Sequence, residues 1–90
     1  MVKTRNIEIE RVQTGLRIEK RILKVLKGMA EFKDVGTNEL LELILMHAFE
    51  NRSCFDDDGF KAIKDLKRVY GVNYDVHDYE NFIEESKKKP

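Results

Sequence analysis

Hydrophobic and polar residues alternate over residues 12–18, and the spacing then changes to that of a helix. The alternation predicts a half-buried strand whose inner face carries Val12, Thr14, Leu16 and Ile18. Ile7 and Ile9 also alternate with charged residues, but in the opposite phase, so one regular strand cannot contain both stretches. Residues 1–11 are therefore either a flexible arm, as we assign them, or a separate extended piece.

Helical spacing predicts an amphipathic helix over residues 19–34. A turn closed by Val35 and Gly36 follows, and a second helix then runs to about Glu50. Hydrophobic residues cover almost the whole circumference of this second helix. It must therefore be covered on more than one side.

The C-terminal half contains two further predicted helices. One lies over residues 60–70, after three aspartates that favour a helix N-terminus, and ends at Gly71. Asp78 is expected to cap a short last helix. Residues 51–90 contain too many aromatic and aliphatic side chains for a disordered tail, so we expect them to pack on the rest of the chain.

The predicted strand has no partner within the chain. A strand–helix–helix unit of about 39 residues is also smaller than most domains that bury enough core to fold alone. Both problems disappear if two copies combine about a two-fold axis, because the strands then pair antiparallel and the second helices pack on each other. We assign eight residues to this dimer core: Leu16, Ile18, Ile22, Leu26, Leu40, Leu41, Ile44 and Leu45.

A family resemblance is carried by the strand QTGLRI, the helix EKRILKVLKGMAEFKD, the turn VGTN and the helix ELLELILMHAFE. Over residues 12–50 the chain resembles the ribbon-helix-helix family, the Arc/MetJ class of dimeric DNA-binding repressors. The resemblance implies a mostly α fold with one short strand, which pairs between two copies as a ribbon in the DNA major groove. It assigns base contacts to Gln13, Gly15 and Arg17. Arg17 suits guanine and Gln13 suits adenine, whereas Gly15 has no side chain with which to read a base.

The resemblance also places a DNA phosphate against the first turn of the second helix. Backbone amides would hold it at Gly36, Thr37 and Asn38. We assign further phosphate contacts to three basic residues of the arm, Lys3, Arg5 and Arg11. The lysines of the first predicted helix fit a solvated face better than a DNA surface; they are Lys20, Lys24 and Lys27.

Charge is distributed unevenly along a chain whose net charge is zero. Residues 1–36 contain nine Lys and Arg against five Asp and Glu, whereas residues 37–90 contain eight against twelve. A basic front half and an acidic back half indicate two surfaces with different partners. We expect the acidic half to face away from DNA, because phosphates repel it.

These patterns divide the chain into an arm (1–11), a dimeric DNA-binding core (12–50) and a helical extension (51–90). The leading interpretation is a homodimeric, sequence-specific transcriptional regulator that binds double-stranded DNA. One alternative is an antitoxin-like interaction module whose acidic half binds a partner protein, and another is a helical adaptor that never binds DNA. The longest apolar stretch is too short to span a bilayer and the N-terminus lacks a signal-peptide core, so we expect a cytoplasmic protein without membrane contact.

The sequence gives little indication of a catalytic site or a metal-binding site. Cys54 is the single cysteine, so it cannot form an intrachain disulfide, and it has no recognisable catalytic setting. A calcium loop built around Gly59 would place Cys54 at the first ligand position and Asp65 where a bidentate Glu is needed. His47 and His77 have no companion cysteine pair for zinc. We therefore expect no enzyme, no cofactor and no metal.

Overall fold

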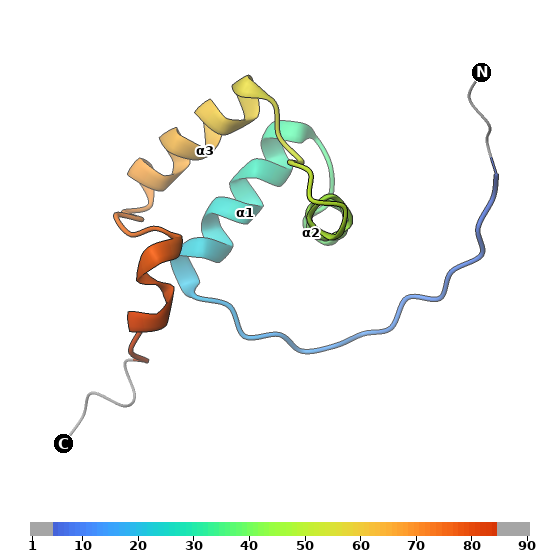
Figure 1. Ribbon diagram of the computed structural model, residues 1–90, viewed down its shortest axis with the longest axis horizontal. Coiled ribbons are helices and arrows are strands. Elements are labelled where there is room, and N and C mark those ends of the chain that lie inside the picture. Colours follow the sequence, from blue (N-terminus) through green and yellow to red (C-terminus); the bar gives the residue numbers. More distant parts are fainter. Residues whose placement is uncertain (1–4, 85–90) are drawn as a thin grey trace.

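The computed structural model describes residues 5–84, and this part of the chain is mostly helical, as predicted. Its regular elements are α1 (Lys20–Lys33), α2 (Thr37–Phe49), α3 (Asp57–Val69) and the short 3-10 helix η1 (Val76–Asn81). Figure 1 shows α1 between its neighbours, with α3 beside it on one side and α2, seen end-on, crossing it on the other. Helix α3 of the C-terminal extension therefore packs directly on the first helix.

Acidic residues cap three of these four elements. Glu19 caps α1 and Asp56 caps α3, each through a carboxylate that accepts backbone amide hydrogen bonds. η1 is capped by Asp75. The Asp78 carboxylate accepts a hydrogen bond from the Asp75 amide and so completes a capping box. The expectation that Asp78 starts the last helix is therefore wrong, although it lies in that helix's first turn.

Each α-helix ends in a turn with one residue in the left-handed conformation. These residues are Asp34, Asn51 and Gly71, with φ of 59°, 57° and 74°. In each case this residue and the next donate amide hydrogen bonds back to the last helical turn, as in a Schellman motif. Gly36 instead has an extended backbone and is the N-cap of α2. The turn between α1 and α2 therefore runs through Asp34, Val35 and Gly36, and the short polar side chain of Asp34 tolerates the left-handed conformation.

A small core forms where the three α-helices meet. The fully buried hydrophobic residues in the described part of the chain are Met29, Ala30 and Leu40, and half-buried side chains surround them, including Leu26, Ile44, Phe55, Ile63 and Leu66. α1 and α3 approach closely at Gly28, where an added Cβ would lie 2.9 Å from the Leu66 side chain. Glycine is intrinsically unfavourable inside a helix, but at this position it permits close helix packing.

The predicted strand is absent from the single chain, because residues 5–84 contain no strand. From Arg5 to Glu19 the chain runs as an extended segment away from α1, α3 and η1 (Figure 1). We call residues 5–19 the extended segment. A strand requires cross-strand hydrogen bonds, and the chain supplies no second strand for residues 12–18. Val12 and Leu16, expected on an inner face, are accordingly 76% and 65% exposed.

Candidate nucleic-acid interface

The predicted base-contacting residues all lie on the surface of the extended segment. Gln13, Gly15 and Arg17 are exposed, and no atom lies within 4 Å of a Cβ built on Gly15. The Arg17 side chain is 90% exposed, and its guanidinium lies 3.4 Å from a carboxylate oxygen of Glu84. An ion pair so long and so exposed contributes little stability. These three positions are therefore accessible to a ligand.

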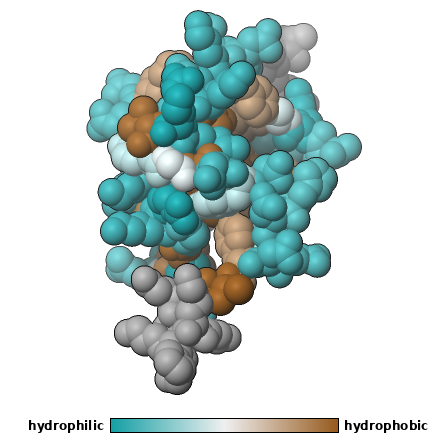
Figure 2. Space-filling model, turned by 90° about the vertical axis from the view of Figure 1, so that its left-hand side faces the viewer, coloured by the Kyte–Doolittle hydropathy of each residue, from teal (hydrophilic) through white to brown (hydrophobic). Residues whose placement is uncertain are grey.

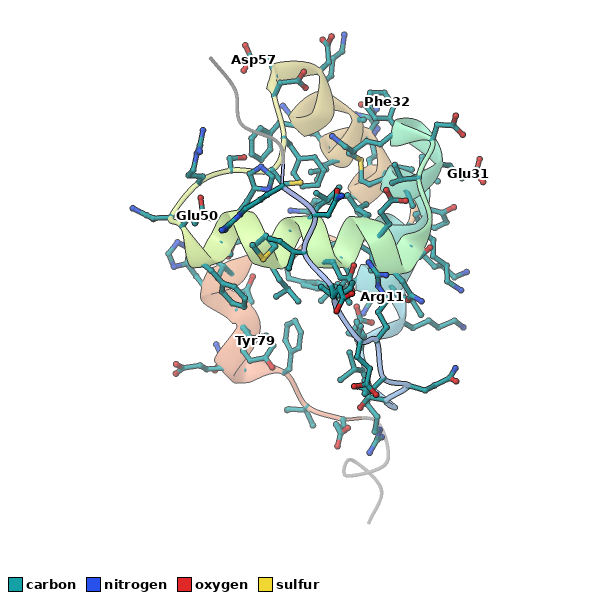
Figure 3. All side chains as sticks on the ribbon, turned by 90° about the vertical axis from the view of Figure 1, so that its right-hand side faces the viewer. Arg11, Glu31, Phe32, Glu50, Asp57 and Tyr79 are labelled. Carbon is teal, nitrogen blue, oxygen red and sulfur yellow. The ribbon has the colours of Figure 1, made fainter. Side chains whose placement is uncertain are left out.

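Arg11 is held by α2 through a two-pronged contact. Its Nε and Nη2 donate to the two carboxylate oxygens of Glu42 at 3.0 and 2.9 Å, where the extended segment passes over α2 (Figure 3). The hydrogen bonds from Arg11 lower the pKa of the Glu42 carboxyl below its ordinary value. Arg11 is thus compensated within the chain. Of the other predicted phosphate contacts in the arm, Arg5 is exposed and Lys3 lies outside the described residues.

The N-terminus of α2 is the predicted phosphate clamp, and no side chain caps it. Gly36 is the N-cap and makes no side-chain hydrogen bond to the helix. The Leu40 amide donates to the Gly36 carbonyl at 2.9 Å, so the amides of Thr37 and Asn38 precede the first helical hydrogen bond. Glu39 adds a carboxylate to the same turn, and this negative charge opposes an anion there.

The predicted dimer core divides into a covered half and an uncovered half. Leu40 is buried, Leu26 and Ile44 pack against the core, and Leu41 is half-buried. The other four residues are exposed: Leu16, Ile18, Ile22 and Leu45. Three more side chains of α2 are exposed as well, namely Leu43, Met46 and Phe49. We call these seven exposed residues the uncovered face.

The side of the molecule that carries α3 and η1 has a different surface. Figure 2 looks onto the side that carries α3 and η1, and it shows mostly hydrophilic residues with separate hydrophobic patches. On α3 the exposed charges include Arg68 and Asp65, which pair with each other at 2.9 Å. The outer side of α3 therefore carries charged groups, and Phe60 and Val69 are exposed beside them.

A polar network joins the extension to the start of α1. The Tyr74 hydroxyl donates to Glu19, whose carboxylate also accepts from the backbone amides of Arg21 and Ile22. The Arg21 side chain donates to Glu19 at 3.3 Å and to the Gly71 carbonyl at 3.4 Å, and its guanidinium lies 5.1 Å from the centre of the Tyr74 ring. The extension is thus tied to the point where the extended segment becomes α1.

This network shifts the ionisation of both partners. Burial alone would raise the pKa of the Glu19 carboxyl, but hydrogen bonds from Tyr74, from the two backbone amides and from the Arg21 side chain outweigh burial and lower that pKa to about 2. Burial and the neighbouring Glu19 carboxylate raise the pKa of the Tyr74 hydroxyl. Glu19 is therefore ionised at neutral pH.

Sequence reasoning missed this network. Glu19 and Tyr74 are 55 positions apart, and Tyr74 falls in a stretch with no regular hydrophobic spacing. The one local signal was an acidic residue at the first position of the first predicted helix. That signal identifies a possible cap, but it does not identify the tyrosine that holds it.

A metal-binding cluster and a membrane-spanning helix are both absent from the described part of the chain. Within residues 5–84 no three His, Cys, Asp or Glu side chains gather as a metal site requires, and no helix has the length and apolar character needed to cross a bilayer. Cys54 is half-buried against the core. No protein-family model, curated protein or solved structure matches the chain. Its function must be inferred from the extended segment, the uncovered face and the first turn of α2.

Proposed function

We propose that the chain acts as a homodimeric transcriptional regulator that binds double-stranded DNA through a two-stranded ribbon, in the manner of the ribbon-helix-helix class it resembles. Residues 12–18 of two copies would pair antiparallel in this ribbon. The observation that carries the proposal is the extended segment, whose apolar side chains are exposed although their alternation fits an inner face. A second copy would supply the missing strand and would cover the uncovered face.

Burial energies support a dimer that depends on the whole uncovered face. Fully burying a Leu or Ile side chain stabilises a fold by roughly 1.5–3 kcal/mol. A dimer would cover each exposed side chain on both copies and would pair the backbone of both strands. Summed over both copies, the free energy of this burial is comparable to the roughly 4–15 kcal/mol cost of association. No single residue is therefore expected to hold the dimer together.

The polar side of the ribbon would remain available to DNA after pairing. Side chains alternate across a strand, so Gln13 and Arg17 would point away from Leu16 and Ile18. Arg17 would donate a bidentate pair of hydrogen bonds to a guanine, and Gln13 would bind an adjacent adenine. The basic balance of residues 1–36 favours approach to the DNA backbone.

The first turn of α2 would anchor the dimer on a phosphate. Its uncapped amides at Thr37 and Asn38 are donors, and the helix dipole favours an anion at this end. Glu39 in the same turn would limit the affinity, so this contact would position the protein rather than dominate binding. Replacing Glu39 with Gln would be expected to strengthen binding to all DNA sequences alike.

Titration with duplex DNA at several salt concentrations, combined with random-site selection, tests the proposal. The wild-type protein should bind more weakly as salt rises and should select one recurrent sequence. Arg17→Ala should cost roughly 1–3 kcal/mol at that sequence and relax selection at one position. Arg68→Ala is the matched control, because Arg68 is also an exposed arginine in a surface ion pair but lies on α3. Equal effects of the two substitutions would contradict base reading by Arg17.

A second candidate is a module that binds a partner protein through the extension. The observation in its favour is a set of exposed apolar side chains around η1, namely Val76, Tyr79 and Ile83, among acidic neighbours. A protein that dimerises but shows no salt-dependent affinity for any duplex would favour this candidate. Salt-dependent DNA binding that is unaffected by Tyr79→Ser would leave the DNA-binding proposal in place.

A further inference from the structure

An open groove lies between the start of α1 and the C-terminal extension. Its volume is about 1840 Å³, and its apolar lining includes Ile18, Ile22, Val69, Tyr74, Phe82 and Ile83. The α1 wall carries the basic residues Lys20, Arg21 and Lys24, and the opposite wall carries the acidic residues Asp78, Glu80 and Glu84. A groove with an apolar lining and charged walls of both signs suits an amphipathic peptide segment.

The arm contains an amphipathic segment that has no apolar surface to pack on. Ile7 and Ile9 are 64% and 63% exposed, and they alternate with Glu8 and Glu10. Their phase is opposite to that of residues 12–18, so they would not share the inner face of the ribbon. They require a separate apolar surface.

The register of the proposed ribbon directs this segment to the groove of the other copy. The inner residues are symmetric about Gly15, so antiparallel pairing sets Val12 opposite Ile18 and Thr14 opposite Leu16. Residue 11 of the second copy then stands opposite Glu19, where this chain turns into α1. The arm of the second copy continues past that turn. Figure 1 shows η1 directly beyond the point where the extended segment enters α1.

We infer that residues 5–11 of a second copy dock in this groove, with Ile7 and Ile9 against the apolar side chains that α3 and the rest of the C-terminal extension contribute to it. The inference rests on the dimer of the proposed function and does not require DNA binding. Arg5 flanks the two isoleucines on the same side of the segment, where the acidic wall offers a partner, and the basic α1 wall suits Glu8 and Glu10. Each copy would thus hold the other by its arm as well as by its ribbon.

Cross-linking between differently substituted copies tests this arrangement. In full-length protein carrying Cys54→Ser, Ile9→Cys chains are mixed with size-tagged Ile83→Cys chains, allowed to exchange and then oxidised. The control replaces the second partner by Phe32→Cys, an exposed position at the other end of α1. We expect covalent heterodimers between positions 9 and 83 in large excess over those between positions 9 and 32. Equal yields would overturn the inference.

Dimer affinity gives an independent measurement. Ile7→Ser combined with Ile9→Ser should weaken dimerisation by roughly tenfold or more in sedimentation experiments, because two partly buried side chains lose their apolar contact. The control, Glu8→Gln combined with Glu10→Gln, should change it far less. A monomeric wild-type protein would overturn the dimer and the arm exchange together. If the wild-type protein is a dimer and the Ile7→Ser, Ile9→Ser variant dimerises with the same affinity, only the arm exchange would be overturned.

Discussion

The two sides of α1 are completed in different ways. On one side α3 packs against Gly28 with Leu66, and its outer surface is charged. On the other side α2 crosses α1 with hydrophobic residues still exposed, and the extended segment, which contacts α2 through the Arg11–Glu42 pair, leaves Val12 and Leu16 exposed to water. The C-terminal extension therefore covers hydrophobic side chains on one side of the core, whereas hydrophobic side chains on the other side are exposed.

This contrast separates two kinds of hydrophobic position. A residue on the α3 side should affect the stability of each chain regardless of its concentration. A residue on the uncovered face should affect stability through association, which depends on concentration. The substitutions below test that distinction in order of decreasing expected effect.

Leu40→Ala should cause the largest loss. Leu40 is fully buried where α1 and α2 meet, and truncating such a side chain typically costs about 2–5 kcal/mol. In a domain of this size that loss approaches the total stability. Urea unfolding followed by circular dichroism measures it, with the exposed Val76→Ala as the control. A loss of unfolding free energy smaller than that of the control would contradict the assignment of Leu40 to the core.

Leu66→Ala and Ile22→Ala compare a covered and an uncovered hydrophobic position directly. Leu66 packs on Gly28 in the covered half, so Leu66→Ala should cost about 2 kcal/mol at every protein concentration. Ile22 belongs to the uncovered face, so Ile22→Ala should lower the thermal midpoint mainly by weakening association. Thermal unfolding over a hundredfold range of concentration distinguishes them. Identical concentration dependence for the two variants would contradict the division.

Tyr74→Phe should have a smaller effect and should change the pH dependence of stability. Loss of one hydrogen bond to a carboxylate should cost about 1 kcal/mol at neutral pH. The pKa of Glu19 is about 2 in the folded chain against an ordinary 4.5, so its contribution is complete above pH 4.5 and is lost as pH falls toward 2. Glu19→Gln should reduce the loss of stability that occurs as pH falls from 4.5 toward 2. The same loss in Glu19→Gln as in the wild type would contradict this role.

Glu42→Gln should have the smallest effect on stability and a measurable effect on DNA. The substitution removes the carboxylate that pairs with Arg11 on the surface, and exposed pairs contribute little to folding. The released Arg11 should reach a phosphate, which would tighten binding to all sequences and steepen the salt dependence by about one phosphate contact. Arg11→Ala in the same background should cancel the gain. A gain that survives Arg11→Ala would point to a different cause.

The helices were predictable from sequence because their signals are local. Hydrophobic spacing places α2 within a residue of its observed end at Phe49. The three aspartates expected at the start of the third helix include its cap, Asp56, while Asp57 and Asp58 lie in its first turn. The strand prediction failed for the single chain because extended backbone becomes a strand only beside a partner. The contacts of Leu66 with Gly28 and of Tyr74 with Glu19 could not be predicted, because residues distant in sequence leave no periodic pattern.

Within the candidate interface, sequence alternation identified which side chains of the extended segment are polar and which are apolar. It could not identify the pairing of Arg11 with Glu42, since both residues have the composition of an ordinary solvated surface. Nor could it identify the uncapped start of α2, because Thr37 and Asn38 are themselves common capping residues. Both features depend on how the backbone places these residues after folding.

The extended segment also has a consequence for the lifetime of the protein in a cell. Proteases cleave exposed, irregular backbone more readily than helices, and this segment presents Arg11 and Arg17 in such a conformation. The basic residues of α1 and α3 lie in helices and are protected by comparison. Any ligand that covers the segment would shield it from cleavage. The rate of degradation would then depend on occupancy, and unengaged copies would be removed first.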